Sequence, residues 1–554
     1  MSKRATILTN SYSVLSKKLK ERGKAMKKRW LSLILIALLL LPLHTFSPSG
    51  ISEAAQQFKL GNEVLMEKYH HLIAGKKVGL VTNQSGVNRQ GVSTIDVLAK
   101  DLTVQLVALY APEHGIDGVA KAGEHVKSYD HPKLKIPVYS LYGSTRMPTE
   151  DMLRNVDVLL FDIQDIGART YTYISTLHNV MVAAQKYDKP VIILDRPNPV
   201  GGIHVEGPVL EDLYKSFVGI DNIPKAHGMT VGEMALFFNR NINATITVIA
   251  MEGYNRNMIY QDTGLSWVQT SPNIPDIESV FGYMATGLGE GTGIHMRDTF
   301  KWIGSRDLNA QRYANLLNSA GLPGVTFIAE PYYNGLIGGV RLHITDYHQF
   351  NPARTGIYAL AFAYQIGDFK VPKSSASNIV MFDKVMGTNK IGQFLEQKMS
   401  PQEIEARYAP ALERFKAERE NYLIYGYAPG YQPPMSQRIA VFVNDQEIDF
   451  DVDPYIDQND RLMVPVRFIV EALGAQVQWH GPTQKVTITK GNRNSQFTIG
   501  SNIAYVNGTR MVYDTHPVIR HDRTMVPTRY VAESMGATVE WIEETRTVLI
   551  ELTS

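Results

Sequence analysis

The chain of 554 residues contains no cysteine at all. It can therefore form no disulfide bond, and it cannot be anchored to a membrane through a lipid on an N-terminal cysteine. A hydrophobic core has to hold the fold together, which is feasible at this length. Hydrophobic residues make up 44% of the chain and charged residues 20%, as in ordinary soluble proteins, and the length predicts two or three domains.

Several short motifs of well-known enzyme classes are also missing. The sequence has no Gly-x-Ser-x-Gly nucleophile elbow, no His-Glu-x-x-His metal motif, no phosphate-binding loop, and no Gly-x-Gly-x-x-Gly after its first predicted strand. A nucleotide cofactor is therefore not expected, and we predict that the protein uses no cofactor.

The amino-terminal segment has the pattern of a secretory signal. The basic run Lys27-Lys28-Arg29 precedes an apolar stretch from Trp30 to Leu43, and the small residues Ala54 and Ala55 follow. The apolar stretch is shorter than the roughly 20 residues that cross a bilayer. We predict cleavage after residue 55 and a secreted, extracellular protein; an uncleaved membrane anchor is the alternative.

Without this amino-terminal segment, the chain has no excess of basic residues. The full chain has 56 basic and 54 acidic residues, a net charge of +2, whereas residues 1–55 alone carry 10 basic and 2 acidic residues. The remaining chain then has 46 basic and 52 acidic residues and a net charge of −6. Nothing in this balance favours nucleic acid as a partner.

Buried strands alternate with helices in the first half of the chain. The predicted strands cover residues 78–82, 104–109, 136–141, 156–161 and 191–194, and the predicted helices cover residues 93–100, 149–154, 172–187 and 230–239. Near-continuous apolar strands between helices are typical of a parallel sheet that is covered on both faces. The predicted fold class is therefore α/β, with a Rossmann-like parallel sheet.

Charged and amide side chains gather where two of these strands end. Leu109-Tyr110-Ala111-Pro112-Glu113-His114-Gly115 ends one strand, and residues 161–170, Phe-Asp-Ile-Gln-Asp-Ile-Gly-Ala-Arg-Thr, end another. The carboxyl ends of parallel strands form the crevice where ligands bind in open α/β sheets. The two strings therefore indicate chemistry more than packing.

These strings and several others, in this order, resemble the bacterial exo-β-N-acetylmuramidases, a family long catalogued as a domain of unknown function. The resemblance runs from about Phe58 to Tyr427 and rests on residues 82–86 (TNQSG), 112–115 (PEHG), 162–169 (DIQDIGAR), 195–199 (DRPNP), 205–208 (VEGP), 227–230 (HGMT) and 271–275 (SPNIP). The run after Thr292, residues 293–300, is shorter than in the family and has a single arginine, Arg297.

The resemblance implies a hydrolase that cuts β-glycosidic bonds, which commonly needs a proton donor and a second group at the anomeric carbon. Glu113, in a turn of Pro112 and Gly115, is the first candidate for the donor, with His114 beside it to tune it or to bind the sugar. Asp162 is expected to orient the acetamido group of N-acetylmuramic acid, whose oxygen can serve as the nucleophile. The alternatives are that Glu113 caps the following segment and that Asp162 or Asp165 forms a structural ion pair that orients the loop.

The resemblance further implies a set of substrate-binding residues. One of Asp162 and Asp165 is expected to face the cleft while the other pairs with Arg169, and Arg169 or Arg297 is expected to bind the lactyl carboxylate of the substrate. Glu290 is the second candidate for the acid. The remaining predicted binding residues are Asn83, Asn198, His227 and Asn273. Turn formation is the alternative for the asparagines, and Thr230 with Glu233 forms a predicted capping box that leaves His227 free.

A linker rich in proline and glycine, residues 428–436, precedes a sequence repeat with an offset of 62 residues. Residues 461–468 (RLMVPVRF) return as residues 523–530 (RTMVPTRY), and each copy predicts a hairpin, a short helix and a second hairpin that carries a tryptophan. This module resembles the amino-terminal domain of copper amine oxidases. Its histidines His480, His516 and His521 are scattered, so we expect no metal there.

The predicted organisation is a signal peptide (1–55), a Rossmann-like catalytic subdomain (56–265), a smaller α+β catalytic subdomain (266–427), the linker, and an α+β accessory module of two repeats (437–554). The leading hypothesis is a secreted exo-acting glycosidase of cell-wall turnover that is associated with the cell wall. Its substrates would be peptidoglycan-derived muropeptides or disaccharides, and its accessory module would bind wall polymer or act as a spacer. Two alternatives remain: a wall-binding protein that has lost activity, which the short loop after Thr292 favours, and a metal-assisted hydrolase using His114, Asp162 and His227.

Overall fold

A computed structural model describes residues 58–429 and 439–552, apart from short gaps at 445, 453, 458, 521–522 and 543–545. The predicted signal segment and almost all of the predicted linker lie outside the described residues. Among the described residues, no helix combines the length and the apolar character that crossing a bilayer requires.

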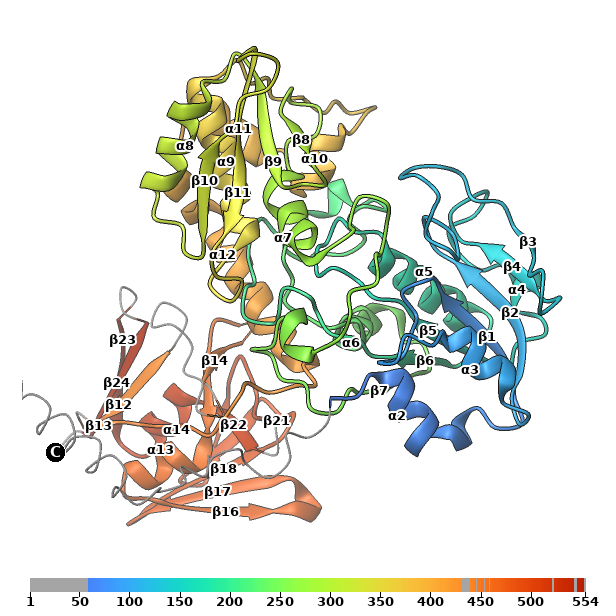
Figure 1. Cartoon of the computed structure of the whole chain (residues 1–554). Helices are drawn as coiled ribbons and strands as arrows, with labels where there is room; N and C mark the ends of the chain where they lie inside the picture. Colours follow the sequence, from blue (N-terminus) through green and yellow to red (C-terminus); the bar gives the residue numbers. More distant parts are fainter. Residues whose placement is uncertain are drawn as a thin grey trace, which may run out of the picture. The chain divides into compact units, whose positions relative to one another are not determined.

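A seven-stranded sheet organises the first part of the chain (Figure 1). Its strand order is β3-β4-β2-β1-β5-β6-β7, and every neighbouring pair is parallel except β3 with β4. The strands are β1 (Lys77–Thr82), β2 (Gln105–Ala111), β3 (Tyr129–Asp130), β4 (Pro137–Ser140), β5 (Val158–Asp162), β6 (Val191–Leu194) and β7 (Ile246–Ile249). The predicted α/β class and the parallel sheet are confirmed; β7 and β3 are strands that the sequence analysis missed.

Helices cover both faces of this sheet, which is why its central strands are apolar along their whole length. Alternate strand residues belong to two separate hydrophobic clusters: Leu159 and Phe161 pack with α5 and α6, and Val158 and Leu160 pack with α2 and α3. The helices of this part are α2 (Gly61–Lys68), α3 (Thr94–Lys100), α4 (Glu150–Leu153), α5 (Tyr173–Lys186) and α6 (Val231–Ile242), with 3₁₀ turns at His70–Leu72, Asp212–Tyr214 and Tyr260–Thr263.

The following part of the chain contains a four-stranded antiparallel sheet of order β10-β11-β9-β8, together with helices. Its elements are α7 (Ile277–Thr286), β8 (His295–Arg297), β9 (Trp302–Arg306), α8 (Ala310–Ser319), β10 (Val325–Ala329), β11 (Ile337–Ile344), α9 (Pro352–Ile366), α10 (Met381–Met386), α11 (Lys390–Glu396), α12 (Pro401–Arg419) and the 3₁₀ turn Glu420–Tyr422.

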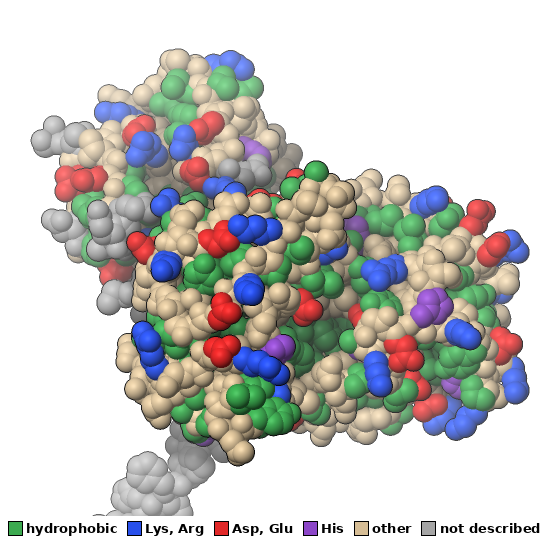
Figure 2. Space-filling view, turned by 90° about the horizontal axis from the view of Figure 1, so that it is seen from above, with side chains coloured by type: hydrophobic (Ala, Val, Ile, Leu, Met, Phe, Trp, Pro, Cys, Tyr) green, Lys and Arg blue, Asp and Glu red, His purple; other side chains and the backbone are tan. Residues whose placement is uncertain are grey.

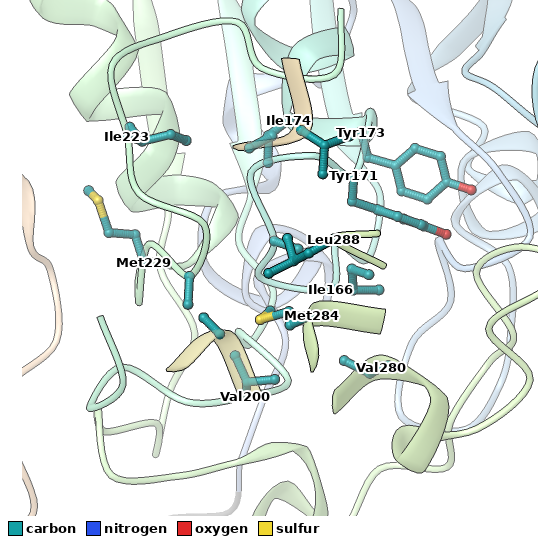
Figure 3. Close-up of a cluster of buried hydrophobic side chains, with 14 of the residues drawn as sticks. Ile166, Tyr171, Tyr173, Ile174, Val200, Ile223, Met229, Val280, Met284 and Leu288 are labelled. Atoms are coloured by element: carbon teal, nitrogen blue, oxygen red, sulfur yellow. The ribbon is translucent and has the colours of Figure 1, made fainter. Parts of the chain in front are cut away.

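One hydrophobic cluster joins these two parts. It runs from Val81 in the first sheet to Phe415 in α12. Figure 3 shows its middle, where Met284 and Leu288 of the second part lie near Ile166 of the first. The predicted division of the catalytic region at residue 265 stays a prediction, since buried side chains are continuous across it.

The described residues of the carboxyl-terminal module form three small sheets and two helices. Its elements are β12 (Ala440–Val443), β13 (Gln446–Glu447), β14 (Tyr455–Ile456), β15 (Leu462–Pro465), α13 (Val466–Ala472), β16 (Gln476–His480), the 3₁₀ turn Gly481–Thr483, β17 (Lys485–Lys490), β18 (Arg493–Thr498), β19 (Ile503–Val506), β20 (Thr509–Val512), β21 (Val518–Arg520), β22 (Arg523–Pro527), α14 (Thr528–Ser534), β23 (Ala537–Ile542) and β24 (Thr547–Leu552).

The two sequence repeats pair with each other through equivalent strands. β15 and β22 are antiparallel, and Val464 lies opposite Val526, its equivalent 62 residues later. Each copy has the predicted order of hairpin, helix and hairpin, with Trp479 on β16 and Trp541 on β23. This pairing relates the two copies by an approximate twofold axis, so the repeat forms one folded unit with a core of its own.

The face shown in Figure 2 carries lysine and arginine interspersed with aspartate and glutamate. No continuous area of one sign is visible on this face, and a hollow with hydrophobic side chains lies near its centre. Mixed charge of this kind gives no electrostatic footprint for nucleic acid on that face.

Candidate active site

The carboxyl ends of three adjacent strands form one edge of the parallel sheet. β1 lies between β2 and β5, and Thr82 at the end of β1 pairs with Asp162 at the end of β5. The strand order reverses between β1 and β5, which is the position where ligands bind in open α/β sheets. The structure therefore brings together the polar segments that follow β1, β2 and β5.

Glu113 lies in a tight turn immediately after β2. The amide of Gly115 donates to the carbonyl of Pro112 at 3.1 Å, and both His114 and Gly115 adopt positive φ angles, 72° and 83°. Nδ1 of His114 lies 2.7 Å from the carbonyl oxygen of Ala120, so this nitrogen carries the proton and donates it. The turn thus fixes the backbone on both sides of Glu113.

The carboxylate of Glu113 is held by two donors from other segments. Oε1 accepts the amide of Gly123 at 2.9 Å, and Oε2 accepts the hydroxyl of Thr172 at 2.6 Å. Burial, together with the nearby Glu113 carboxylate, raises the pKa of Tyr142 to about 12. Glu113 is 7% exposed, so its carboxylate is oriented within the edge of the sheet and does not project into solvent.

Asp162 has a different environment from the one expected. It is completely buried, and its Oδ1 accepts Nε of Arg196 at 2.5 Å. Its Oδ2 accepts the hydroxyl of Thr94 at 2.6 Å and the amide of Asn62 at 3.3 Å. Both oxygens are occupied by protein donors, which is the structural ion pair considered as the alternative and not a carboxylate open to a ligand.

Asp165 and His227 lie next to each other with unused hydrogen-bonding capacity. Oδ2 of Asp165 accepts the amide of Gly167 at 2.7 Å and lies 4.0 Å from Nε2 of His227, whereas Oδ1 has no partner. Burial raises the pKa of Asp165 to about 7. Burial, with the nearby Arg419, lowers the pKa of His227 to about 3, so the imidazole is neutral at physiological pH.

The expected pairing of Arg169 with a carboxylate is wrong. The guanidinium is fully buried and donates to three backbone carbonyls, those of Pro208 at 2.7 Å, Ile223 at 2.9 Å and Val385 at 2.8 Å. These bonds tie the segment after β5 to loops more than 35 residues away. Arg169 therefore acts as a structural clamp through its two terminal nitrogens, while its Nε is buried without a partner.

The three asparagines and Glu290 occupy unlike positions. Asn83 is buried and accepts from both the amide and the hydroxyl of Ser85, while its Nδ2 has no partner. Asn198 accepts the amide of Val200 in its own turn at 3.1 Å, and its Nδ2 donates to the carbonyl of Met229, 31 residues away, at 3.1 Å. Asn273 and Glu290 are exposed, and Glu290 contributes to the raised pKa of Tyr283.

Arg297 lies on β8, in the part of the chain that follows α7. Its guanidinium lies over the rings of Trp302, Tyr332 and Tyr333, at 5.7, 4.9 and 5.2 Å from their centroids. No carboxylate of the described residues lies within salt-bridge distance of it. Aromatic rings that hold a cation in this way leave its hydrogen-bond donors available to an anion.

A group of three tyrosines, one of which lies beside Lys225, was not predicted. The ring of Tyr171 lies 4.8 Å from that of Tyr173 and 5.9 Å from that of Tyr283, and Figure 3 shows Tyr171 and Tyr173 pointing to the same side. Nζ of Lys225 donates to the hydroxyl of Thr170 at 2.8 Å and lies 5.0 Å from the Tyr283 ring. Burial lowers the pKa of Lys225 well below its usual range.

The string Thr170-Tyr171-Thr172-Tyr173 continues the motif at the end of β5. Its position was a sequence signal that could have pointed to Tyr171 and Tyr173. Tyr283, on α7, has no such local signal.

The metal-assisted alternative needed His114, Asp162 and His227 around one ion. The described residues contain no group of three potential ligand side chains that could hold a metal ion, and these three have the separate partners given above.

Comparison with known sequences gives three matching family descriptions. Residues 78–278 match "Exo-beta-N-acetylmuramidase NamZ, N-terminal", residues 281–425 match "Exo-beta-N-acetylmuramidase NamZ, C-terminal", and residues 442–550 match "Copper amine oxidase N-terminal domain". The chain is 42% identical over 396 residues to the peptidoglycan beta-N-acetylmuramidase NamZ of Bacillus subtilis (strain 168). The matched region covers 68% of this chain and 94% of the Bacillus protein.

Two solved structures of DUF1343 family proteins from Bacteroides fragilis NCTC 9343 are also similar. One is 36% identical with a TM-score of 0.59, and the other is 27% identical with a TM-score of 0.51. Each match covers 67% of this chain and 99% of the Bacteroides chain.

Proposed function

From the premise that the chain belongs to the exo-beta-N-acetylmuramidase NamZ family and is a glycosidase, we propose that it releases β-linked N-acetylmuramic acid from the non-reducing ends of peptidoglycan fragments. The protein acts outside the cell, after removal of the segment before residue 56, and contributes to cell-wall turnover. Its carboxyl-terminal module binds wall polymer and holds the catalytic part near its substrate.

The observation that carries this proposal is the placement of Glu113. It lies at the carboxyl end of β2, next to the reversal point of the sheet, and it is held by Gly123 and Thr172. The hydroxyl of Thr172 can accept as well as donate, so the same contact supports the carboxyl group before and after it gives up a proton. In this role Glu113 protonates the oxygen of the departing sugar.

The substrate carries two features that the site has to recognise besides the scissile bond. Its lactyl carboxylate is assigned to Arg297, because both terminal nitrogens of Arg169, the other candidate, already donate to backbone carbonyls. With Asp162 occupied by Arg196, Thr94 and Asn62, the acetamido group has to be oriented by other residues if its oxygen is the nucleophile.

The test uses the chain from residue 56 onward with an aryl β-N-acetylmuramide and with glycan strands whose non-reducing end is N-acetylmuramic acid. We expect release of the aryl alcohol, and release of single N-acetylmuramic acid from the strands without internal fragments. Internal fragments would contradict exo action. Binding to cell walls without release of any sugar would instead support the wall-binding protein that has lost activity.

A further inference from the structure

Buried polar atoms without partners gather at the edge of the sheet where β1 and β5 end. They include Nδ2 of Asn83, Oε1 of Gln164, Oδ1 of Asp165 and Nε2 of His227. These side chains are all more than nine-tenths buried. Native proteins rarely leave buried polar groups without a partner, so such a group marks a place that a ligand or water fills.

The hydrogen-bonding character of His227 follows from its backbone contact. The amide of Met229 donates to Nδ1 at 3.2 Å, so Nδ1 is the acceptor of the ring. In a neutral imidazole the other nitrogen then carries the proton. Nε2 of His227 is therefore a buried N–H donor with no acceptor, and it lies 4.0 Å from Oδ2 of Asp165.

The separation between these two atoms defines what fits between them. A distance of 4.0 Å is too long for a direct hydrogen bond. A single oxygen atom can bond to both side chains if it accepts from Nε2 of His227 and donates to the carboxylate of Asp165. A hydroxyl group meets both conditions, whereas the ether oxygen of a glycosidic bond can accept but has no hydrogen to donate.

The pair lies close to the proposed acid. Asp165 and Thr172, whose hydroxyl donates to Oε2 of Glu113 at 2.6 Å, belong to the same segment after β5, and both carboxylates contribute to the raised pKa of Tyr173 and Tyr283. A pyranose ring has C1 and C4 at opposite ends. A sugar whose C1 faces Glu113 therefore directs its C4 substituent away from that residue.

We propose that Asp165 and His227 together bind the free 4-hydroxyl of the terminal sugar, and that this contact restricts the enzyme to chain ends. The inference rests on the proposed function. N-Acetylmuramic acid has free hydroxyls only at C4 and C6 once it is linked through C1, because C2 carries the acetamido group and C3 the lactyl ether. Within a glycan strand the C4 oxygen is an ether, so an internal residue offers no hydrogen to the ionised carboxylate of Asp165, the form that predominates above about pH 7.

The experiment compares aryl β-N-acetylmuramides that lack the hydroxyl at C4 or at C6 with the parent compound. We expect the 4-deoxy compound to lower kcat/KM by about 10²-fold or more, because the site then loses hydrogen bonds to buried groups. The 6-deoxy compound should lower it less than about 5-fold. An unchanged kcat/KM for the 4-deoxy compound, as would follow if the pair held only water, would overturn the proposal, and so would a loss confined to the 6-deoxy compound.

Variants of the pair give a second measurement. In Asp165→Asn and in His227→Ala, the ratio of kcat/KM for the parent compound to kcat/KM for the 4-deoxy compound should fall below about 10. His227→Gln keeps an N–H donor and should preserve more of this preference. Asp195→Asn is the matched control: Asp195 is also a buried carboxylate, but Thr230, Gly232 and Tyr425 donate to its oxygens, so its variant should keep the preference.

A preference that survives in Asp165→Asn and His227→Ala would overturn the assignment to this pair. The comparison within one variant does not depend on its overall activity, so partial unfolding does not obscure it. If the unaltered enzyme releases no aryl alcohol from the parent compound, the muramidase proposal itself fails and this inference fails with it.

Discussion

The hydroxyl of Thr172 donates a 2.6 Å hydrogen bond to Oε2 of Glu113 and so joins the residue preceding α5 to the turn after β2. The two residues are 59 positions apart in the sequence. Only β1 lies between β2 and β5 in the sheet. The carboxyl ends of β2 and β5 therefore lie at the same edge, close enough for this contact.

Glu113→Gln removes the proposed proton donor and preserves the shape of the side chain. We expect kcat to fall by about 10²–10⁴-fold on a disaccharide, whose leaving group needs a proton. The loss should be much smaller on an aryl glycoside with an acidic leaving group. Steady-state kinetics on both substrates, with Glu290→Gln in parallel, measure this. Equal losses on both substrates, or the substrate-dependent loss in Glu290→Gln instead, would move the acid role away from Glu113.

Arg169→Lys separates a structural role from substrate binding. An ammonium group cannot reach the carbonyls of Pro208, Ile223 and Val385 at once, because it lacks the planar fork of the guanidinium. We expect the free energy of unfolding to fall by about 3 kcal/mol, the scale of lost charge-assisted hydrogen bonds. Denaturant unfolding gives this value. The KM of the folded variant should stay near that of the unaltered enzyme, and a large rise in KM without loss of stability would contradict the clamp role.

Asp165→Asn should change how stability depends on pH. In the folded protein the pKa of Asp165 is raised from 3.8 to about 7, so the folded state holds the proton more tightly than the unfolded state. Its contribution to stability is complete below about pH 4 and is lost as pH rises through 7. The unaltered protein should therefore lose up to about 4 kcal/mol relative to Asp165→Asn over this range.

Thermal unfolding of both proteins between pH 4 and pH 8 tests this pH dependence. Asp195, whose pKa is also raised to about 7, is present in both proteins, so its effect cancels in the difference. A difference in stability that does not vary with pH would show that Asp165 is ionised throughout.

A chain that spans residues 56–429 should keep its activity on small soluble substrates. The carboxyl-terminal module has a hydrophobic core of its own, formed by residues from Ile439 to Ile550. Ending at residue 429 preserves Tyr425, whose hydroxyl donates to Asp195 at 2.7 Å. Kinetics on an aryl muramide and sedimentation with cell walls measure the two functions separately. A folded truncation without activity on the small substrate would contradict the division, and undiminished wall binding would contradict a binding role for the module.

Local sequence was sufficient for the main strands and helices of the first sheet. β1, β2, β5 and β6 are near-continuous apolar runs, and such runs are buried wherever they pack. Thr230 and Glu233 form the predicted capping box of α6 because that contact spans only three residues. β7 was missed: it is an edge strand of four residues, and only Ile249 in it is buried, so its pattern is weak.

The sequence could not predict which groups the charged side chains bind. Asp162 is next to Ile163 in the chain, yet its carboxylate bonds to Arg196, 34 residues away, and Arg169 clamps a carbonyl 216 residues away. Charged groups in a buried segment bind whichever donors or acceptors the packing places beside them. Spacing along the chain therefore could not decide which carboxylate faces the cleft.

The sequence by itself determined the parallel sheet, the strand ends that are followed by Glu113 and Asp165, the short motif that holds His227 before α6, and the internal repeat. Hydrophobic periodicity and turn residues act over a few positions and are visible in any window of the chain. Only the tertiary structure decided that Asp162 and Arg169 are structural and that Asp165 meets His227. Those contacts join segments from different loops, and they depend on the strand order that places the loops side by side.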